Sequence, residues 1–251
     1  MGHPVALSER NLSTLRYGDE NIAYAVRVNS ARRERIAIHV HPDGAVEVEA
    51  PEDASEEAIR KAVMKRARWV LRHVTDARKR FEHVLPRQYV SGEQALYLGR
   101  RYVLKVIQVP KGERSIKLNR GLLVVATDNT DSAALRARVR AWYRVKARDY
   151  FAGRIAAISK ALPWVQEPPP FRLLDMKRQW GSCATGGSVT LNPFLVKAPR
   201  EAIDYVITHE LCHLREHNHS PEFFRLLTRS MPGWESIKSR LDHSAEIILN
   251  D

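Results

Sequence analysis

The chain has 251 residues, of which 44% are apolar and 28% charged, a balance typical of a soluble globular protein with a sizeable core. No apolar run approaches the roughly 18 residues of a membrane-spanning helix, and the first ten residues lack the pattern of a signal peptide. We therefore expect a cytoplasmic protein without membrane association. Two cysteines, Cys183 and Cys212, exclude a disulfide scaffold. The net charge of +12 favours a polyanionic partner or a solvated basic surface, and charge alone does not separate these.

Strands and one helix are predicted in the first part of the chain. Three segments alternate between apolar and polar side chains, as half-buried strands do: residues 22–28, 35–41 and 45–51. Pro42–Gly44 is a turn signal between the second and third of them. Residues 55–81 then predict one helix, with Ser55 as its N-cap.

The predicted helix at 55–81 is strongly basic. Such a face can bind the phosphates of a nucleic acid, and nucleic acid is therefore a possible partner. A solvated helix face is the other interpretation, and it is somewhat favoured. The basic residues of this face include Lys61, Lys65, Arg66, Arg68, Arg72, Arg78, Lys79 and Arg80.

A similar order of elements follows. Strands are predicted at residues 101–109, 115–119 and 122–128, with a turn at Asn119–Gly121, and a long helix begins near Asp131. The recurrence of strands followed by a basic helix is compatible with a degenerate duplication, although the copies share no clear residue identity. We place the main boundary at the long helix, which gives a β-rich region at 1–130 and a second domain at 131–251.

Four prolines within residues 163–170 interrupt any helix. The sequence beyond them predicts a compact set of elements. These are a strand at 171–176, a loop at 177–187, a strand at 188–192 that could pair with an extended peptide, a histidine-rich helix at 200–217 and two further helices.

The histidine-rich helix carries the pattern H-E-x-x-H at residues 209–213. His209 and His213 lie one turn apart on the same face, so both imidazoles can bind one Zn²⁺ ion. Glu210 lies beside that face, from where it can act as general base on a zinc-bound water without binding the metal.

A catalytic zinc site needs a third protein ligand. His217 is on the same face if the helix continues, but it lies about 12 Å along the axis from His209. His219 can reach the ion if the helix ends near Asn218, a residue that tolerates the left-handed conformation. Ser220 and Pro221 then begin a new helix. We favour His219 as third ligand, and the competing candidates are His217, Cys183 and a downstream glutamate: Glu222, Glu235 or Glu246.

The segment at 178–224 resembles the YgjP-like metallopeptidase domain family, a relative of the SprT-like zinc proteases. The resemblance rests on W-G-S-C at 180–183, G-x-V-x-L-N at 187–192, H-E-L-C-H at 209–213 and H-S-P at 219–221. It implies an α+β fold, in which a zincin-like domain packs a short sheet on the metal helix. It also implies His209, His213 and His219 as zinc ligands and Glu210 as the catalytic acid/base. Gln179 stands where the family usually has arginine, which leaves an anion-binding role there in doubt.

The loop before the second short strand is a candidate substrate-binding wall. Trp180, Gly181 and Ser182 form either this wall or a tight structural turn. Asn192 orients a ligand, contacts the substrate or caps its strand.

We expect a zinc-dependent metallopeptidase that acts on a peptide or protein. One alternative is a metal-dependent hydrolase of nucleotide phosphoanhydrides, which the basic charge favours somewhat. Another is a nucleic-acid-associated module with a structural zinc. No sequence feature indicates the oligomeric state.

Overall fold

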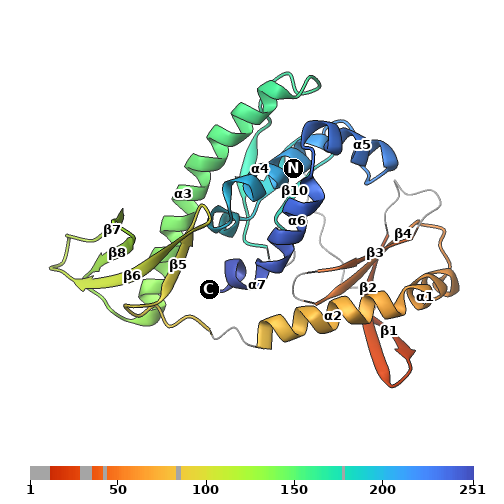
Figure 1. The fold of residues 1–251 in the computed structure, drawn as a ribbon, viewed down its shortest axis with the longest axis horizontal. Helices are drawn as coiled ribbons and strands as arrows, with labels where there is room; N and C mark the ends of the chain where they lie inside the picture. The colour runs from red at the N-terminus through yellow and green to blue at the C-terminus, as the bar shows by residue number, and fades with distance from the viewer. Residues whose placement is uncertain (1–11, 29–35, 42–43, 83–85, 177–178) are drawn as a thin grey trace, which may run out of the picture. The chain divides into compact units, whose positions relative to one another are not determined.

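The computed structural model describes residues 12–28, 36–41, 44–82, 86–176 and 179–251. The chain folds into two compact units, Met1–His83 and Val84–Asp251, each with a hydrophobic core of its own (Figure 1). Both units combine helices with small sheets, so the α+β prediction is confirmed. No helix among the described residues is long and apolar enough to cross a bilayer.

The first unit contains a four-stranded sheet in the order β1-β2-β4-β3. β2 and β4 are parallel neighbours, and each also pairs with an antiparallel strand on its other side. The strands β2 to β4 match the prediction, whereas β1 was not predicted. Pro42 and Asp43 of the expected turn lie outside the described residues. The strands are β1 (Leu12–Tyr17), β2 (Glu20–Val28), β3 (Ala37–Val40) and β4 (Val46–Ala50).

Two helices, not one, follow this sheet. Ser55 caps α1 (Glu56–Lys65), as predicted, by accepting a hydrogen bond from the Ala58 backbone nitrogen at 3.2 Å. The chain leaves helical geometry at Arg66, where φ is −112°, and resumes as α2 (Ala67–Glu82). The predicted continuous helix at 55–81 is therefore wrong at one residue. The buried sides of both helices pack on the sheet in one core, through Ile59, Val63, Ala67, Val70 and Val74.

The second unit begins with another four-stranded sheet, in the order β5-β6-β8-β7. Its pairings repeat those of the first unit: a parallel central pair, with an antiparallel neighbour on each outer side. Arg120 and Gly121 make the predicted turn with positive φ of 45° and 82°. β5 was not predicted. The strands are β5 (Gln94–Tyr97), β6 (Arg100–Gln108), β7 (Ser115–Asn119) and β8 (Leu122–Thr127).

The long helix α3 (Ser132–Ala161) connects this sheet to the rest of the second unit, as Figure 1 shows. Asp131 is its N-cap, accepting a hydrogen bond from Ala134 at 3.0 Å. Every fourth residue is buried along its whole length: Leu135, Val139, Tyr143, Ala147, Phe151, Ile155 and Ser159.

The boundary predicted at residue 130 differs from that of the structure. Leu123 and Val125 of β8 lie in the same core as Leu135 and Val139 of α3, so the second sheet belongs with the C-terminal elements. The structure divides the chain at 83/84 instead. Buried residues alternate along β8, and α3 shares a core with them, so this helix covers the face of the sheet on which they lie.

The C-terminal part of the second unit has a three-stranded sheet in the order β10-β11-β9. β10 and β11 are antiparallel, and β11 and β9 are parallel. α4 packs on β10, and α3 packs on β9. The elements are β9 (Phe171–Leu173), β10 (Gly181–Cys183), β11 (Val189–Leu191), the 3₁₀ helix η1 (Pro193–Lys197), α4 (Arg200–Cys212), α5 (Pro221–Ser230), α6 (Trp234–His243) and α7 (Ala245–Leu249).

Candidate metal centre

The helix α4 is buried on nearly all sides, as its apolar residues predict. Two polar contacts fix it against its neighbours. Arg154 of α3 binds Asp204 through two hydrogen bonds of 2.7 and 2.9 Å, and the Trp164 indole donates to the Leu211 carbonyl at 3.0 Å. The short sheet also packs on α4, through β10, which confirms the expected arrangement of sheet and helix.

Three histidines converge at the C-terminal end of α4. The nearest ring nitrogens of His209, His213 and His219 all lie within 4.8 Å of one another. Nε2 of His209 and Nε2 of His219 are 3.0 Å apart. Zinc–nitrogen bonds of about 2.0–2.1 Å in a tetrahedron place two ligand nitrogens about 3.3 Å apart, so this spacing fits one ion.

The candidate metal-binding group contains these three histidines alone, as far as the chain is described. His217 is exposed and is not a member of it. Cys183, Glu222, Glu235 and Glu246, which the sequence also offered as third ligands, lie outside the group as well.

α4 ends earlier than predicted. Its last residue is Cys212 and not a residue near Asn218, and Asn218 does not adopt a left-handed conformation. A tight turn follows, in which the backbone nitrogens of Arg215 and Glu216 donate to the Cys212 carbonyl at 3.1 and 2.9 Å. The chain nevertheless turns back, as expected, and this turn brings the ring of His219 next to the ring of His209.

The start of α5 fixes the return of the chain. Ser220 caps the helix by accepting a hydrogen bond from the Phe223 backbone nitrogen at 3.1 Å, and Pro221 occupies its first turn, as predicted. The fully buried Phe223 ring then packs on all three histidines, with centroid distances of 4.4 to 4.9 Å. Sequence reasoning missed Phe223, since an apolar residue in a first helical turn carries no signal of this contact.

The ring of His213 is oriented by a backbone carbonyl. Its Nδ1 lies 3.0 Å from the oxygen of Glu216. Because a carbonyl can only accept, Nδ1 carries the hydrogen, and Nε2 keeps the lone pair that a metal would bind. Burial, and then the charges of His219 and His213, hold the pKa of His209 well below its ordinary value. The neutral ring is the form that binds metal ions.

Glu210 is buried beside this group, with 5% of its surface exposed. Burial raises the pKa of its carboxyl to about 8. No ion pair or hydrogen bond to this side chain occurs among the described residues. A buried carboxylate without a partner is costly, and a divalent cation nearby would favour its charged form.

Gly181 of β10 lies directly against Glu210. A Cβ atom placed on Gly181 would be 2.7 Å from Oε1 of Glu210, closer than such contacts occur in proteins. Of the predicted substrate wall, Gly181 thus borders the candidate base. Ser182 follows Gly181 in the same strand, and Trp180 precedes it. The Trp180 ring packs against the core, and its indole nitrogen has no hydrogen-bond partner in the described part of the chain.

Asn192 lies outside the reach of a substrate because it is fully buried. Its oxygen caps η1 by accepting from Phe194, and its amide donates to the carbonyls of Met176 and Gln179 at 2.7 and 3.3 Å. The expectation of a direct substrate contact is therefore wrong for this residue, and its role is structural, although it caps η1 and not its strand.

The edge of the short sheet also differs from the expectation. Residues 188–192 were predicted to pair with an extended peptide, which requires an edge strand, but β11 is the central strand, with β10 and β9 on its two sides. The edge nearest α4 is β10, which contributes Gly181.

A family model with the description YgjP-like, metallopeptidase domain, matches residues 34–244 and places the protein in the class of metallopeptidases. The chain belongs to the YgjP-like metallopeptidase domain family. No curated protein sequence matches the chain.

Two solved structures resemble a part of the chain. One is the metallopeptidase zymogen abylysin of Pyrococcus abyssi, 25% identical, with a TM-score of 0.34, covering 36% of this chain and 90% of that chain. The other is the metallopeptidase zymogen jannalysin of Methanocaldococcus jannaschii, 21% identical, with a TM-score of 0.35, covering 38% of this chain and 96% of that chain.

Proposed function

We propose that this protein is a zinc-dependent peptidase whose metal ligands are His209, His213 and His219 and whose general base is Glu210. The observation that carries the proposal is the convergence of three imidazoles beside a buried, unpartnered carboxyl group on one helix. The family of the chain agrees with a metal-dependent peptidase. Zinc suits three neutral imidazoles and leaves a fourth position open.

Each residue has a distinct role in this proposal. When bound, zinc would supply Lewis acidity, which polarises the scissile carbonyl and lowers the pKa of water. His213 is held ready by the Glu216 carbonyl, and Phe223 restrains all three rings. Glu210 would accept a proton from the attacking water and pass it to the leaving amine nitrogen.

The substrate would bind along β10. In the described part of the sheet, this strand has a neighbour on one side only, so an extended peptide can pair with its other side. A peptide held there passes Gly181, and Gly181 borders Glu210. Trp180 and Ser182 flank this point and would contact the substrate.

The test is to compare the wild type with Glu210→Gln for zinc content and for hydrolysis. Casein and a mixed peptide library are the peptidase substrates, and nucleoside triphosphates are the comparison substrates. We expect about one zinc per chain in both proteins and peptide hydrolysis in the wild type alone. Glutamine keeps the shape of the side chain but accepts no proton, and a positioned general base is worth about a hundred- to ten-thousand-fold in rate.

Two other outcomes would contradict the proposal and indicate another function. Triphosphate hydrolysis without peptide hydrolysis would mean a phosphoanhydride hydrolase. Zinc in both proteins without any hydrolysis would mean a structural metal. A cytoplasmic location stays a prediction from the sequence.

A further inference from the structure

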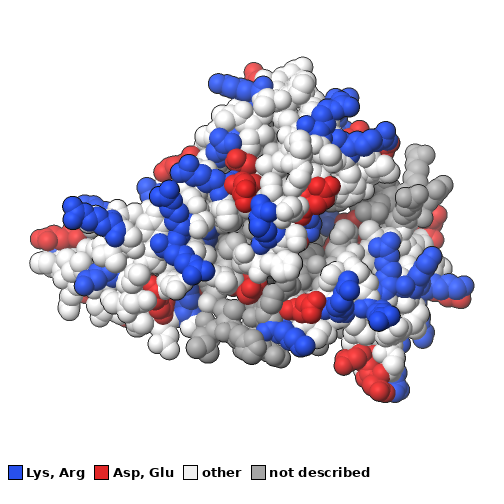
Figure 2. All heavy atoms as spheres, viewed as in Figure 1, with Lys and Arg blue, Asp and Glu red and all other residues white. Residues whose placement is uncertain are grey.

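The first unit carries a concentration of positive charge on its two helices. Between Arg60 and Arg80 the sequence has nine lysines and arginines and one acidic residue, Asp76. Figure 2 shows Lys and Arg side chains over α1 and α2 on the face that it presents. The sheet of the same unit is different, because its Arg27 forms ion pairs with Glu47 and Glu49 at 3.5 and 3.7 Å.

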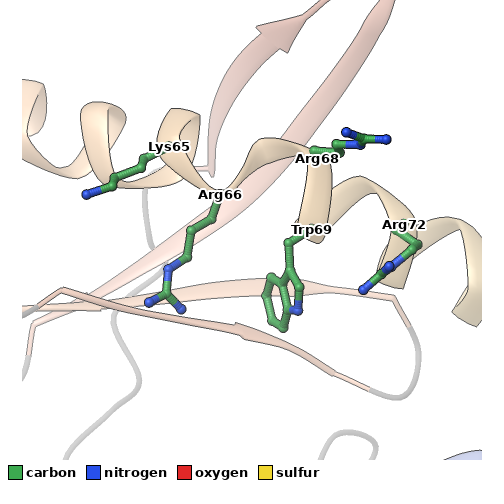
Figure 3. A pocket seen from close by; sticks show the side chains of 5 residues that line it. All are labelled: Lys65, Arg66, Arg68, Trp69 and Arg72. Carbon is green, nitrogen blue, oxygen red and sulfur yellow. The ribbon is translucent and has the colours of Figure 1, made fainter.

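A surface pocket lies where α1 passes into α2. Its lining consists of four cationic residues and one aromatic residue: Lys65, Arg66, Arg68, Arg72 and Trp69. In Figure 3, Arg66, Trp69 and Arg72 extend to the same side of the helices, whereas Arg68 points away from them. The interruption of the helix at Arg66 contributes to this arrangement, because it sets Arg66 apart from the regular turn.

The four cations that line this pocket are not neutralised within the described part of the protein. None of them takes part in an ion pair or a hydrogen bond there. Like charges that gather without counter-charges raise the electrostatic potential of the pocket, and a polyanion would relieve their repulsion. The charge therefore indicates an anionic ligand with several negative groups.

Trp69 narrows the choice of polyanion. Its ring is half-buried: one part packs against the core of the unit, and His73 meets it edge-on at a centroid distance of 4.4 Å. The rest of the ring lines the pocket between the guanidinium groups. An aromatic surface beside cations offers stacking to a planar base and ion pairing to the adjacent phosphates. An acidic polypeptide would use the charges but not the ring, and a duplex keeps its bases stacked inside.

We propose that the first unit binds single-stranded nucleic acid, with a base stacked on Trp69 and the neighbouring phosphates held by Lys65, Arg66 and Arg72. This site lies in another unit than the three histidines, and the proposal does not depend on the proposed peptidase activity.

The test is fluorescence anisotropy with the full chain and labelled 20-nucleotide oligonucleotides of DNA and RNA. The comparison ligands are the same DNA as a duplex and a polyglutamate of similar charge. We expect both single strands to bind more tightly than the duplex and the polyglutamate. The single strand with the higher affinity shows whether the site prefers DNA or RNA. Contact with three or four phosphates predicts a slope of about −2 to −3 in log K against log salt, at about 0.7 per phosphate of a single strand.

Variants separate the ring from the charges. Trp69→Leu should weaken single-strand binding roughly tenfold or more, because stacking contributes about 1–3 kcal/mol per base, and Trp69→Phe should restore a part of it. Arg66→Gln with Arg72→Gln should lower the salt slope by about 1.4, for two lost phosphate contacts. The matched control is Arg101→Gln with Lys105→Gln on β6, which removes the same charge from exposed positions in the other unit.

Three results would overturn the proposal. They are an absence of binding at low salt, equal binding of polyglutamate and single strands, and an unchanged affinity in the Arg66→Gln and Arg72→Gln double variant. The last of these holds even if Trp69→Leu fails to fold, since both arginines are exposed.

Discussion

The absence of a side chain at Gly181 leaves room for the Glu210 carboxyl group. The Cβ of an alanine at 181 would lie 2.7 Å from Oε1 of Glu210 and 2.9 Å from its Cγ. Because Glu210 is buried, the side chain has little room to move aside. We expect Gly181→Ala to retain zinc and to lose most of the hydrolysis, roughly a hundredfold or more, as for a displaced general base.

The chain offers a matched control for this substitution. Gly186 lies in the turn after β10, and a Cβ there would meet no atom within 4 Å. Gly186→Ala should therefore keep zinc content and activity close to those of the wild type. Equal activities of the two alanine variants, measured on the same peptide, would contradict the placement of Glu210 against β10.

The sequence predicts the three converging histidines and the buried glutamate, but not their surroundings. His209 and His213 are fixed by helical geometry, so a spacing of four residues suffices to place them. The contact of Gly181 with Glu210 joins residues 29 positions apart, and no local pattern encodes it. Asn192 was misjudged for the same reason, because its burial depends on loops that surround it only in the folded chain.

At the scale of single elements, the start of α5 holds the histidines of the proposed metal centre in place. Ser220→Ala would remove the hydrogen bond to the Phe223 backbone nitrogen, and loss of such a cap costs about 0.5–2 kcal/mol of stability. Since Phe223 packs on all three histidines, we also expect a several-fold loss of zinc affinity, measured by competition with a chelating indicator.

Ser55→Ala is the control for the cap of α5. It removes an equivalent hydrogen bond, to the Ala58 nitrogen, from α1 in the other unit. It should lower stability by a similar amount and leave zinc affinity unchanged. If both variants lose zinc affinity equally, the effect is a general destabilisation and not a property of α5.

Lys197 in η1 gives the second unit a pH-dependent stability. Its side chain is 2% exposed, its nitrogen donates to the Asn250 carbonyl at 3.1 Å, and burial lowers its pKa to about 7 from 10.5. Between these two values the unfolded chain binds more protons than the folded chain, so the contribution of Lys197 to the free energy of unfolding rises with pH. Below about pH 7 the buried lysine is charged in the folded chain as well, and its destabilisation of the folded state is then at its maximum.

Urea unfolding at pH 7 and pH 9 tests this dependence. Relative to Lys197→Met, the wild type should gain roughly 2 kcal/mol between the two pH values, since one proton corresponds to about 1.4 kcal/mol per pH unit and the folded chain holds about half of this proton at pH 7. Lys160→Met, at an exposed position of α3, should follow the wild type. A Lys197→Met curve parallel to that of the wild type would contradict the lowered pKa.

The elements that sequence reasoning missed are those with weak local signals. β1 has Leu15 as its one fully buried residue and β5 has Ala95, so neither shows a clear alternation. The interruption at Arg66 involves neither glycine nor proline, and the early end of α4 at Cys212 has no such residue after it. In both places the backbone follows tertiary contacts and not a stop signal.

At the scale of the whole molecule, each unit has a core of its own, and the boundary lies between His83 and Val84. We therefore expect residues 84–251 to fold alone, to bind zinc and to hydrolyse peptides at a rate close to that of the full chain. A fragment of residues 131–251 should not fold, because it lacks β5 to β8, which cover α3. Circular dichroism, thermal unfolding and zinc content distinguish the two fragments. A folded, zinc-binding fragment of 131–251 would favour the boundary that the sequence predicted.

The recurrence of strands and a basic helix was visible in the sequence, and the structure extends it to strand order and pairing. The boundary between the units was not visible. The segment near residue 83 has no cluster of prolines or glycines that would mark a boundary. The predicted boundary near residue 130 was placed there because a long helix begins after it. That helix is the covering element of the preceding sheet, and a sequence pattern does not show which sheet a helix covers.

The most direct test of the zinc centre is the zinc content and affinity of the whole chain, compared between His219→Ala and His217→Ala. The two histidines are two residues apart, but His219 alone of the pair belongs to the converging group. We predict about one zinc per chain in the wild type, an unchanged value in His217→Ala and loss of most zinc in His219→Ala. Zinc lost in His217→Ala and retained in His219→Ala, or no zinc bound by the wild type after reconstitution, would contradict the proposed zinc centre.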